Sequence, residues 1–169
     1  KSEADCKTNA DHLTALQAAI DKKWNSQTAK PEDRVRPLHF VPQVYTLSWV
    51  GEADRKRFYN ALAKTPDKIT IYITGWGVWS VPNSSDLDVV RKELQRPAAW
   101  WWNYPCNDNA DGQVYPSDMY YNFFEMPAVA NNAKMPKQLE HGLGIVSNPM
   151  QEGEISKTAL FSVADYAWN

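Results

Sequence analysis

The residues best suited to chemistry follow a run of three adjacent tryptophans. Residues 98–108 read Ala-Ala-Trp-Trp-Trp-Asn-Tyr-Pro-Cys-Asn-Asp, and Asn103, Asn107 and Asp108 gather where the apolar run ends. A sugar has apolar C–H faces and hydroxyl groups at its edge, so aromatic rings beside amide and carboxylate groups suit it. The alternative interpretation is a core strand followed by a polar turn.

Composition narrows the classes of protein that fit this chain. It has 169 residues, enough for one domain with a core. Its net charge is −2 and no basic stripe is visible, so nucleic acid is not an expected partner. No apolar stretch approaches the roughly 20 residues of a membrane span. The eight tryptophans and eight tyrosines fit a protein that faces carbohydrate, although large aromatic residues also fill cores.

Other kinds of site have no support in the sequence. The three histidines, His12, His39 and His141, lack the spacing of a metal site, so no metal is expected. No phosphate-binding glycine motif occurs, and no cofactor is expected. Cys6 and Cys106 form no disulfide framework; they could pair, but free buried thiols are the favoured interpretation.

Four helical patterns alternate with four strand patterns. The expected helices are roughly residues 9–23, 53–64 and 84–94, and a last one that begins near Gln151 or Glu152. The expected strands are residues 38–41, 69–73, the tryptophan run, and 143–147. A long irregular segment from Pro105 to about Glu140 separates the last two strands. In the first helix, Thr8 or Asn9 should form the cap. Its inner stripe should be Leu13, Leu16, Ile20 and Trp24.

The spacing of the strands predicts the fold class. Apart from the long segment, they repeat at roughly 30 residues, the period of a βα unit, which implies parallel strands with right-handed crossovers. Both the open doubly wound sheet and the eight-fold barrel use this unit. A complete (β/α)8 barrel needs about 250 residues, so four units would be about half of one.

Polar or aromatic side chains follow each expected strand. They are Tyr45 and Ser48 after the first; Thr74, Trp76 and Trp79 after the second; Asn103, Asn107 and Asp108 after the third; and Asn148 after the fourth. In a parallel α/β array all these positions lie at the carboxyl edge, where such folds bind ligands. The pattern therefore predicts a pocket there, against the alternative that loop residues are polar in any case.

Several linked motifs resemble one family over essentially the whole chain. In order they are Trp101-Trp102-Asn103-Tyr104-Pro105-x-Asn107-Asp108, Val146-Ser147-Asn148-Pro149-Met150, Glu154-x-Ser156-Lys157 and Ala164-Asp165-Tyr166-Ala167-Trp168-Asn169, joined by Val41-Pro42-x-x-Tyr45 and Thr74-Gly75. They resemble glycoside hydrolase family 84, the β-N-acetylglucosaminidases that include O-GlcNAcase and bacterial enzymes often called hyaluronidases.

The resemblance implies an eight-fold βα barrel of which residues 1–169 are the second half, strands five to eight, a partial catalytic domain. It also implies retaining exo-hydrolysis in which the sugar's 2-acetamido oxygen attacks and forms an oxazoline, an exception to the scheme of two catalytic carboxylates. In that family, one of two adjacent aspartates orients and polarises the acetamide N–H, and the other is the general acid and then the general base. That pair is expected just upstream of Lys1, so the fragment alone should be inactive.

The same resemblance implies roles for individual residues. Asp108 matches a carboxylate that holds the outer hydroxyls, and Asn103 and Asn148 match amides that bind neighbouring hydroxyls. Tyr45 matches a tyrosine that stabilises the attacking acetamide. The wall around the acetamido methyl group is matched by Val41, Thr74, Val78 and Trp101, which could equally be barrel core.

Four further residues complete the expectations for the site. Val41 stands where members of that family commonly have a cysteine. Trp100 and Trp102 should pack outward beneath the helices, because alternate strand residues point to opposite faces. Asp86 is explained by the dipole at a helix start.

The partners follow from the same interpretation. The expected ligand is a glycan or glycoconjugate with terminal N-acetylglucosamine; protein-linked O-GlcNAc, hyaluronan fragments, mucin glycans and peptidoglycan-derived sugars all stay open. Unpaired strand edges predict association with the amino-terminal half of the same protein or with another copy. For a bacterial source the expected location is secreted or periplasmic. The alternative function is a non-catalytic, lectin-like module.

Overall fold

Four parallel strands and four α-helices form the part of the chain that the computed structural model describes, residues 2–26, 28–108 and 141–168. The order along the chain is α1 (Glu3–Trp24), β1 (His39–Phe40), α2 (Glu52–Leu62), β2 (Thr70–Ile73), α3 (Ser84–Leu94), β3 (Ala99–Trp102), β4 (Ile145–Ser147) and α4 (Gly153–Trp168). Most of the predicted irregular segment between β3 and β4 lies outside the described residues.

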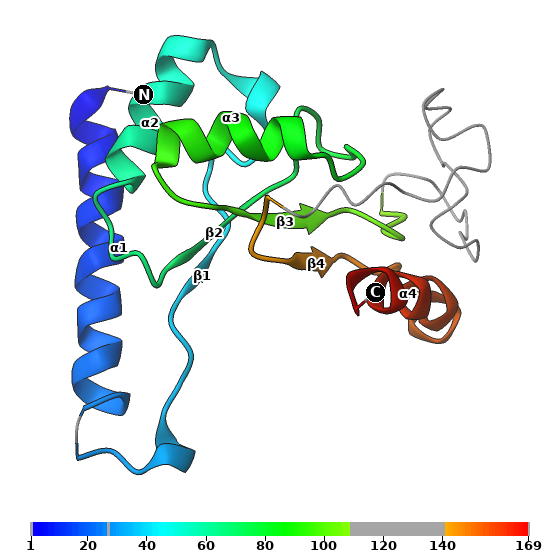
Figure 1. Ribbon diagram of the computed structural model, residues 1–169, viewed down its shortest axis with the longest axis horizontal. Helices are drawn as coiled ribbons and strands as arrows, with labels where there is room; N and C mark the ends of the chain where they lie inside the picture. Colours follow the sequence, from blue (N-terminus) through cyan, green and yellow to red (C-terminus); the bar gives the residue numbers. More distant parts are fainter. Residues whose placement is uncertain (1, 27, 109–140, 169) are drawn as a thin grey trace.

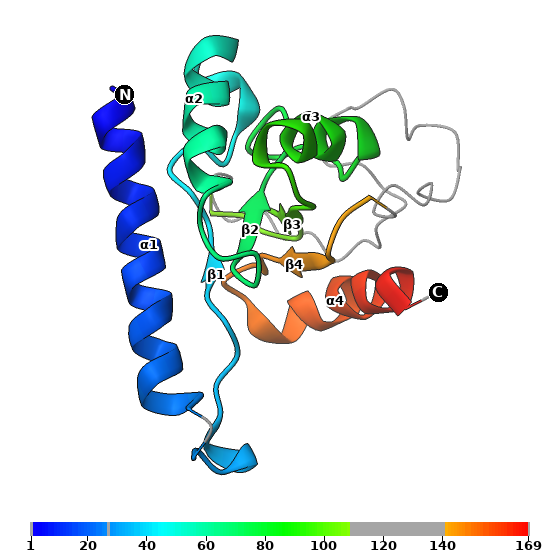
Figure 2. The same cartoon turned by 60° about the vertical axis from the view of Figure 1, so that its left-hand side comes forward.

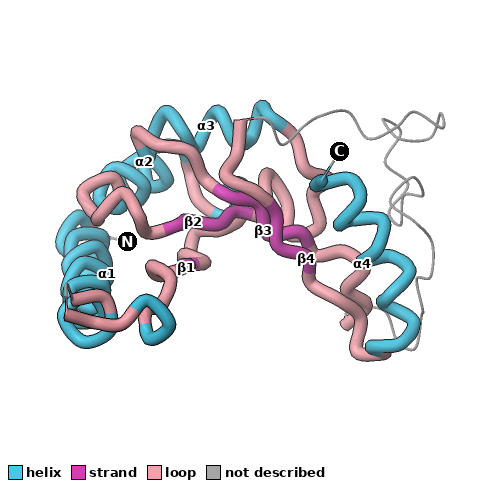
Figure 3. Tube along the Cα trace, turned by 60° about the horizontal axis from the view of Figure 1, so that its bottom comes forward, coloured by secondary structure: helices cyan, strands magenta, loops and turns pink. Residues whose placement is uncertain are grey.

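The strands form one parallel sheet in the order β1-β2-β3-β4, as the βα spacing predicts. Each strand pairs with the next in sequence: His39 lies opposite Thr70, Tyr72 opposite Ala99 and Trp100 opposite Ile145. Figures 1 and 2 show α2 and α3 covering one face of the sheet, with α4 beside β4. Seen from below, the helices form an outer arc around the curved strands (Figure 3). The predicted half-barrel of parallel βα units is therefore confirmed.

The core lies between the outer face of the sheet and the helices. Its largest fully buried side chains come from both layers: Trp100, Tyr59, Leu47, Leu62, Ile69, Ile71, Ile73, Leu87 and Leu94. The hydroxyl of Tyr59 donates to the carbonyl of Val44 at 2.6 Å, which satisfies a polar group that burial would otherwise leave unpaired. Burial also raises the pKa of Tyr59, so this donor keeps its proton.

The first helix differs from its prediction. It begins six residues earlier, at Glu3, because Ser2 and Asp5 form a capping box that outweighs Thr8 and Asn9 as start signals. Leu13 is buried as expected, but Leu16 is 51% exposed and Trp24 is 41% exposed. The residues that are buried in α1 are Cys6, Ala10, Leu13 and Gln17.

Gln17 explains part of that difference. Its Oε1 accepts from the backbone N–H of Leu38 at 2.8 Å, and its Nε2 donates to Asp21 at 3.1 Å. A polar side chain can therefore occupy a fully buried position, where hydrophobic periodicity predicts an apolar one. Leu16 lies at the flank of this buried face, and Trp24 is the last residue of the helix.

Two further features concern the chain as a whole. Cys6 and Cys106 are both free thiols; Cys6 is buried as expected, whereas Cys106 is only half-buried. None of the helices in the described residues is long and apolar enough to cross a membrane.

Candidate active site

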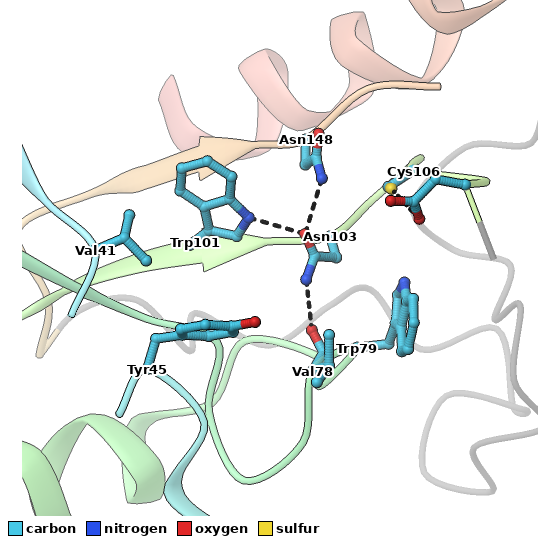
Figure 4. A pocket seen from close by; sticks show the side chains of 9 residues that line it. Val41, Tyr45, Val78, Trp79, Trp101, Asn103, Cys106 and Asn148 are labelled. Atoms are coloured by element: carbon cyan, nitrogen blue, oxygen red, sulfur yellow. Dashed lines mark hydrogen bonds between the residues drawn. The ribbon is translucent and has the colours of Figure 1, made fainter. Parts of the chain in front are cut away.

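A pocket of about 430 Å³ opens at the carboxyl ends of the strands (Figure 4). Residues that follow or end all four strands line it: Val41, Tyr45, Val78, Trp79, Trp101, Asn103, Cys106, Asp108 and Asn148. Indole rings and valines supply its apolar wall, while amides, a phenol, a thiol and one carboxylate supply hydrogen-bonding groups. This mixture suits a small polar ligand with apolar faces.

The tryptophan run divides between core and pocket as strand alternation requires. Trp100 and Trp102 are 0% and 6% exposed and belong to the core beneath the helices. Trp101, between them, points to the other face and lines the pocket. Trp102 also stacks on Tyr104, with ring centroids 4.6 Å apart, which anchors the segment that leaves β3.

Asn103 connects three of the segments that line the pocket. Its Oδ1 accepts from Trp101 Nε1 at 2.8 Å and from Asn148 Nδ2 at 3.0 Å, and its Nδ2 donates to the carbonyl of Val78 at 2.8 Å (Figure 4). Both lone pairs of the amide oxygen are used, so at most one N–H of Asn103 is left for a ligand. Asn148 keeps one N–H, and its Oδ1 has no hydrogen-bond partner among the described residues.

The loop after β2 carries Val78 and Trp79 and is held at its start by Asp86. Asp86 Oδ2 accepts from the backbone N–H of Trp76 at 2.8 Å and from Asn83 Nδ2 at 3.0 Å. The N-cap of α3 is Asn83, whose side chain accepts from the N–H of Asp86. Asp86 therefore positions a wall of the pocket, in addition to lying at a helix start as the sequence suggested.

The Tyr45 segment is fixed through Thr74. The backbone carbonyl of Tyr45 accepts from the N–H of Thr74 at 2.9 Å, and the hydroxyls of Thr46 and Thr74 are 2.9 Å apart. The half-buried ring of Tyr45 packs edge-on against Trp49, with centroids 4.6 Å apart. Thr74 itself is 1% exposed and is not among the residues that line the pocket.

Asp108 is the carboxylate of the pocket, and the thiol of Cys106 donates to its Oδ1 at 3.0 Å. Burial raises the pKa of the Cys106 thiol most, and the hydrogen bond to the Asp108 carboxylate raises it further, while the backbone N–H of Asp108 partly offsets the increase. Asn107, between them, points away: its Nδ2 donates to Glu152 at 2.9 Å and its Oδ1 accepts from the N–H of Gln151 at 3.3 Å. These two bonds tie the segment to the start of α4.

Seven of the eight residues proposed from the sequence line this one pocket. They are Val41, Tyr45, Val78, Trp101, Asn103, Asp108 and Asn148, whereas Thr74 is buried beside the backbone of Tyr45. The sequence placed Trp79 at the predicted pocket without giving it a role in binding, and it did not indicate Cys106. Cys106 lies inside the motif that carries Asn103 and Asp108, so its position alone could have indicated it.

Comparisons with known proteins show the family and the fold of the chain. The family model described as β-N-acetylglucosaminidase matches residues 1–169. The solved structure of CpGH84D is 25% identical with a TM-score of 0.75, and a point mutant of the Thermobaculum terrenum O-GlcNAc hydrolase is 26% identical with a TM-score of 0.69. CpGH84B, 24% identical with a TM-score of 0.63, shares the fold.

The chain is much shorter than these solved relatives. It is covered to 97% by CpGH84D and by the Thermobaculum terrenum hydrolase, and to 93% by CpGH84B. It spans 24%, 30% and 26% of those three chains, respectively.

Proposed function

The chain belongs to the β-N-acetylglucosaminidases of glycoside hydrolase family 84, and from this membership we propose that it forms the sugar-binding wall of a retaining exo-β-N-acetylglucosaminidase. The substrate is a glycan or glycoconjugate with a terminal β-linked N-acetylglucosamine. The observation that carries the proposal is that seven of the eight residues implied by the resemblance line one pocket at the carboxyl end of a parallel sheet.

In this proposal the polar side chains hold the hydroxyl groups of the sugar. Asp108 binds the outer hydroxyls with its carboxylate. Each hydrogen bond to this charged group would contribute about 1.5–3 kcal/mol to binding. Asn148 has more hydrogen-bonding capacity left than Asn103, so Asn148 makes the closer contact with the ligand and Asn103 contributes at most one N–H. Tyr45 lies at the reacting centre and stabilises the acetamide as it attacks.

The apolar side chains hold the acetamido methyl group. Val41, Val78 and Trp101 line the same pocket as the polar residues, so an apolar group and hydroxyls can be bound together. Thr74 acts indirectly, because its backbone N–H fixes Tyr45. Trp79 adds a second indole to this wall.

The acid and base come from polypeptide outside this chain. The sequence contains no two adjacent aspartates, which substrate-assisted hydrolysis through an oxazoline uses in this family. We therefore assign the pair to a segment upstream of Lys1 and expect residues 1–169 alone to be inactive. The chain spans 24% of CpGH84D and 30% of the Thermobaculum terrenum hydrolase, which supports the proposal that the catalytic pair lies in another part of the protein.

We place the chain in the second half of the barrel. In a βα unit the strand precedes the helix. Helix α1 comes before β1, so the strand that forms a unit with α1 would lie upstream of it. The described residues leave β1 and β4 each with one unpaired edge, and α4 exposes Phe161 and Trp168. A preceding half-barrel, or a second copy of the chain, would cover these edges and apolar side chains.

The test uses the complete protein and an aryl N-acetyl-β-glucosaminide. Replacing Asp108 by Ala should lower kcat/KM at least tenfold, the equivalent of about 1.4 kcal/mol of lost binding. The control is Asp33→Ala, an exposed carboxylate outside the pocket. An Asp108→Ala enzyme with unchanged kcat/KM would refute the assignment of this pocket.

The second candidate is a lectin-like module that binds sugar without cleaving it. The missing aspartate pair is the observation that favours it. Calorimetric titration of N-acetylglucosamine into the complete protein, with a hydrolysis assay on the same sample, separates the two. Binding without any turnover supports the lectin, whereas turnover excludes it.

A further inference from the structure

The carboxylate of Asp108 has one oxygen occupied before any ligand arrives. Cys106 Sγ donates to Asp108 Oδ1 at 3.0 Å, and both residues line the pocket. Among the described residues, Oδ2 of Asp108 makes no hydrogen bond. An aspartate carboxylate rotates easily about its last torsion, so a fixed donor on one oxygen decides where the other points.

The backbone between these two residues keeps them on the same side. Asn107 is 8% exposed and is bonded to Gln151 and Glu152 at the start of α4. Because Asn107 is tied to the α4 side, its two neighbours, Cys106 and Asp108, both turn toward the pocket. The thiol is therefore held beside the carboxylate by contacts that do not involve the ligand.

We propose that Cys106 is a positioning residue for sugar recognition: its thiol holds the Asp108 carboxylate so that Oδ2 faces the outer hydroxyls of the ligand. The inference rests on the proposed function of the pocket. It assigns to Cys106 a role in discriminating the orientation of a hydroxyl, since a carboxylate fixed at one angle accepts from one epimer better than from the other.

The expected signature is a change in KM and in epimer selectivity, with kcat nearly preserved. Asp108 would bind the sugar in the ground state and in the transition state alike, so losing its alignment removes uniform binding. In the complete protein, Cys106→Ala should raise KM about fivefold and reduce the preference for an aryl N-acetyl-β-glucosaminide over the galacto epimer by a similar factor, as expected for one lost hydrogen bond.

Cys106→Ser separates positioning from a merely structural role. The serine hydroxyl is also a hydrogen-bond donor. Cys106→Ser should therefore have a KM and an epimer preference close to those of the unmodified protein. The control is Cys6→Ala, because Cys6 is the other free cysteine and does not line the pocket. It should leave both quantities unchanged.

The outcomes distinguish this inference from the function on which it rests. If Cys106→Ala leaves KM and epimer preference unchanged while Asp108→Ala is impaired, the positioning role is wrong and the pocket assignment stands. If Ser fails to rescue and both Cys106 variants melt at a lower temperature, the role is structural and the inference is overturned. If Asp108→Ala is also unimpaired, the proposed function itself fails.

Discussion

The side-chain amides of Asn103 and Asn148 are bonded to each other, with 3.0 Å between Asn148 Nδ2 and Asn103 Oδ1. One residue follows β3 and the other follows β4, so the bond joins two neighbouring strands at the edge where the pocket opens. The same Asn103 also holds the loop after β2 through the carbonyl of Val78. A single amide thus sets the relative positions of three pocket walls.

Removing that amide should destabilise the protein and loosen the pocket. Asn103→Ala leaves Trp101 Nε1, the Val78 carbonyl and Asn148 without this partner, and should lower the free energy of unfolding by about 1–3 kcal/mol. Urea denaturation measures the loss. In a double-mutant cycle with Asn148→Ala, we expect a coupling energy of about 0.5–1.5 kcal/mol; additivity within about 0.3 kcal/mol would contradict the contact.

Gly75 permits the close approach of β2's end to the tryptophan run. Its φ is +87°, and a Cβ built there would lie 2.5 Å from Trp100 Cη2 and 2.8 Å from Asp86 Oδ2. Gly75→Ala should therefore cost about 3 kcal/mol, from a strained backbone and from overpacking. Thermal unfolding measures it, with Gly153→Ala as the control, because nothing lies within 4 Å of a Cβ there. Equal melting temperatures for the two variants would be inconsistent with this packing.

A buried ion pair joins α2 to α3 behind the sheet. The guanidinium of Arg55 bonds to the Glu93 carboxylate through Nε, at 3.2 Å to each oxygen, and through Nη2 at 3.0 Å. Glu93→Ala should destabilise the protein by about 3–5 kcal/mol, because it leaves a buried charge unpaired. Glu154→Ala, which removes an exposed pair with Lys157, should cost less than about 1 kcal/mol.

A double variant provides a further check on this ion pair. Arg55→Met together with Glu93→Leu replaces both charges by apolar side chains and should recover most of the stability lost in Glu93→Ala. Chemical denaturation of the three variants gives the comparison. A double variant as unstable as the single one would show that packing, rather than the unpaired charge, causes the loss.

The thiol of Cys106 should react at a higher pH than an ordinary thiol. Burial and the neighbouring Asp108 raise its pKa, so the reactive thiolate forms later as the pH increases. The rate of alkylation at Cys106, followed by peptide mass spectrometry, should reach half its maximum at a higher pH than for a cysteine in a short unstructured peptide. Asp108→Asn removes the negative charge and should move that midpoint down; no movement would argue against their contact.

Much of the fold follows from the sequence because strand spacing and strand ends carry strong signals. Ile71 and Ile73 lie in a β-branched run, and Asn103, Asp108 and Asn148 follow within a few residues of apolar runs. Parallel pairing then brings their ends to one edge, which is why seven proposed residues meet there. Their roles in binding stay predictions until ligand contacts are measured.

Some features of the structure depend on contacts between distant residues, and the hydrophobic periodicity of the sequence does not predict them. Gln17 is buried because a hydrogen bond to Leu38 satisfies it, a contact across 21 residues that no local pattern predicts. Thr74 follows β2 as proposed and its hydroxyl lies 2.9 Å from that of Thr46; it is not among the residues that line the pocket, and its role in binding stays a prediction. Cys106 becomes part of the pocket only because Asn107 is tied to the start of α4.

The residues that line the pocket are spread along the sequence from Val41 to Asn148. Ligand binding to this pocket is therefore coupled to folding of the sheet. The wall is complete only when all four strands are paired, so a ligand that fills the pocket binds the folded sheet and not the unfolded chain. A sugar held at a hundred times its dissociation constant would add about 2.7 kcal/mol to the stability of the assembled state. A ligand that binds this pocket would therefore also protect the chain from proteolysis, because it lowers the population of the unfolded state.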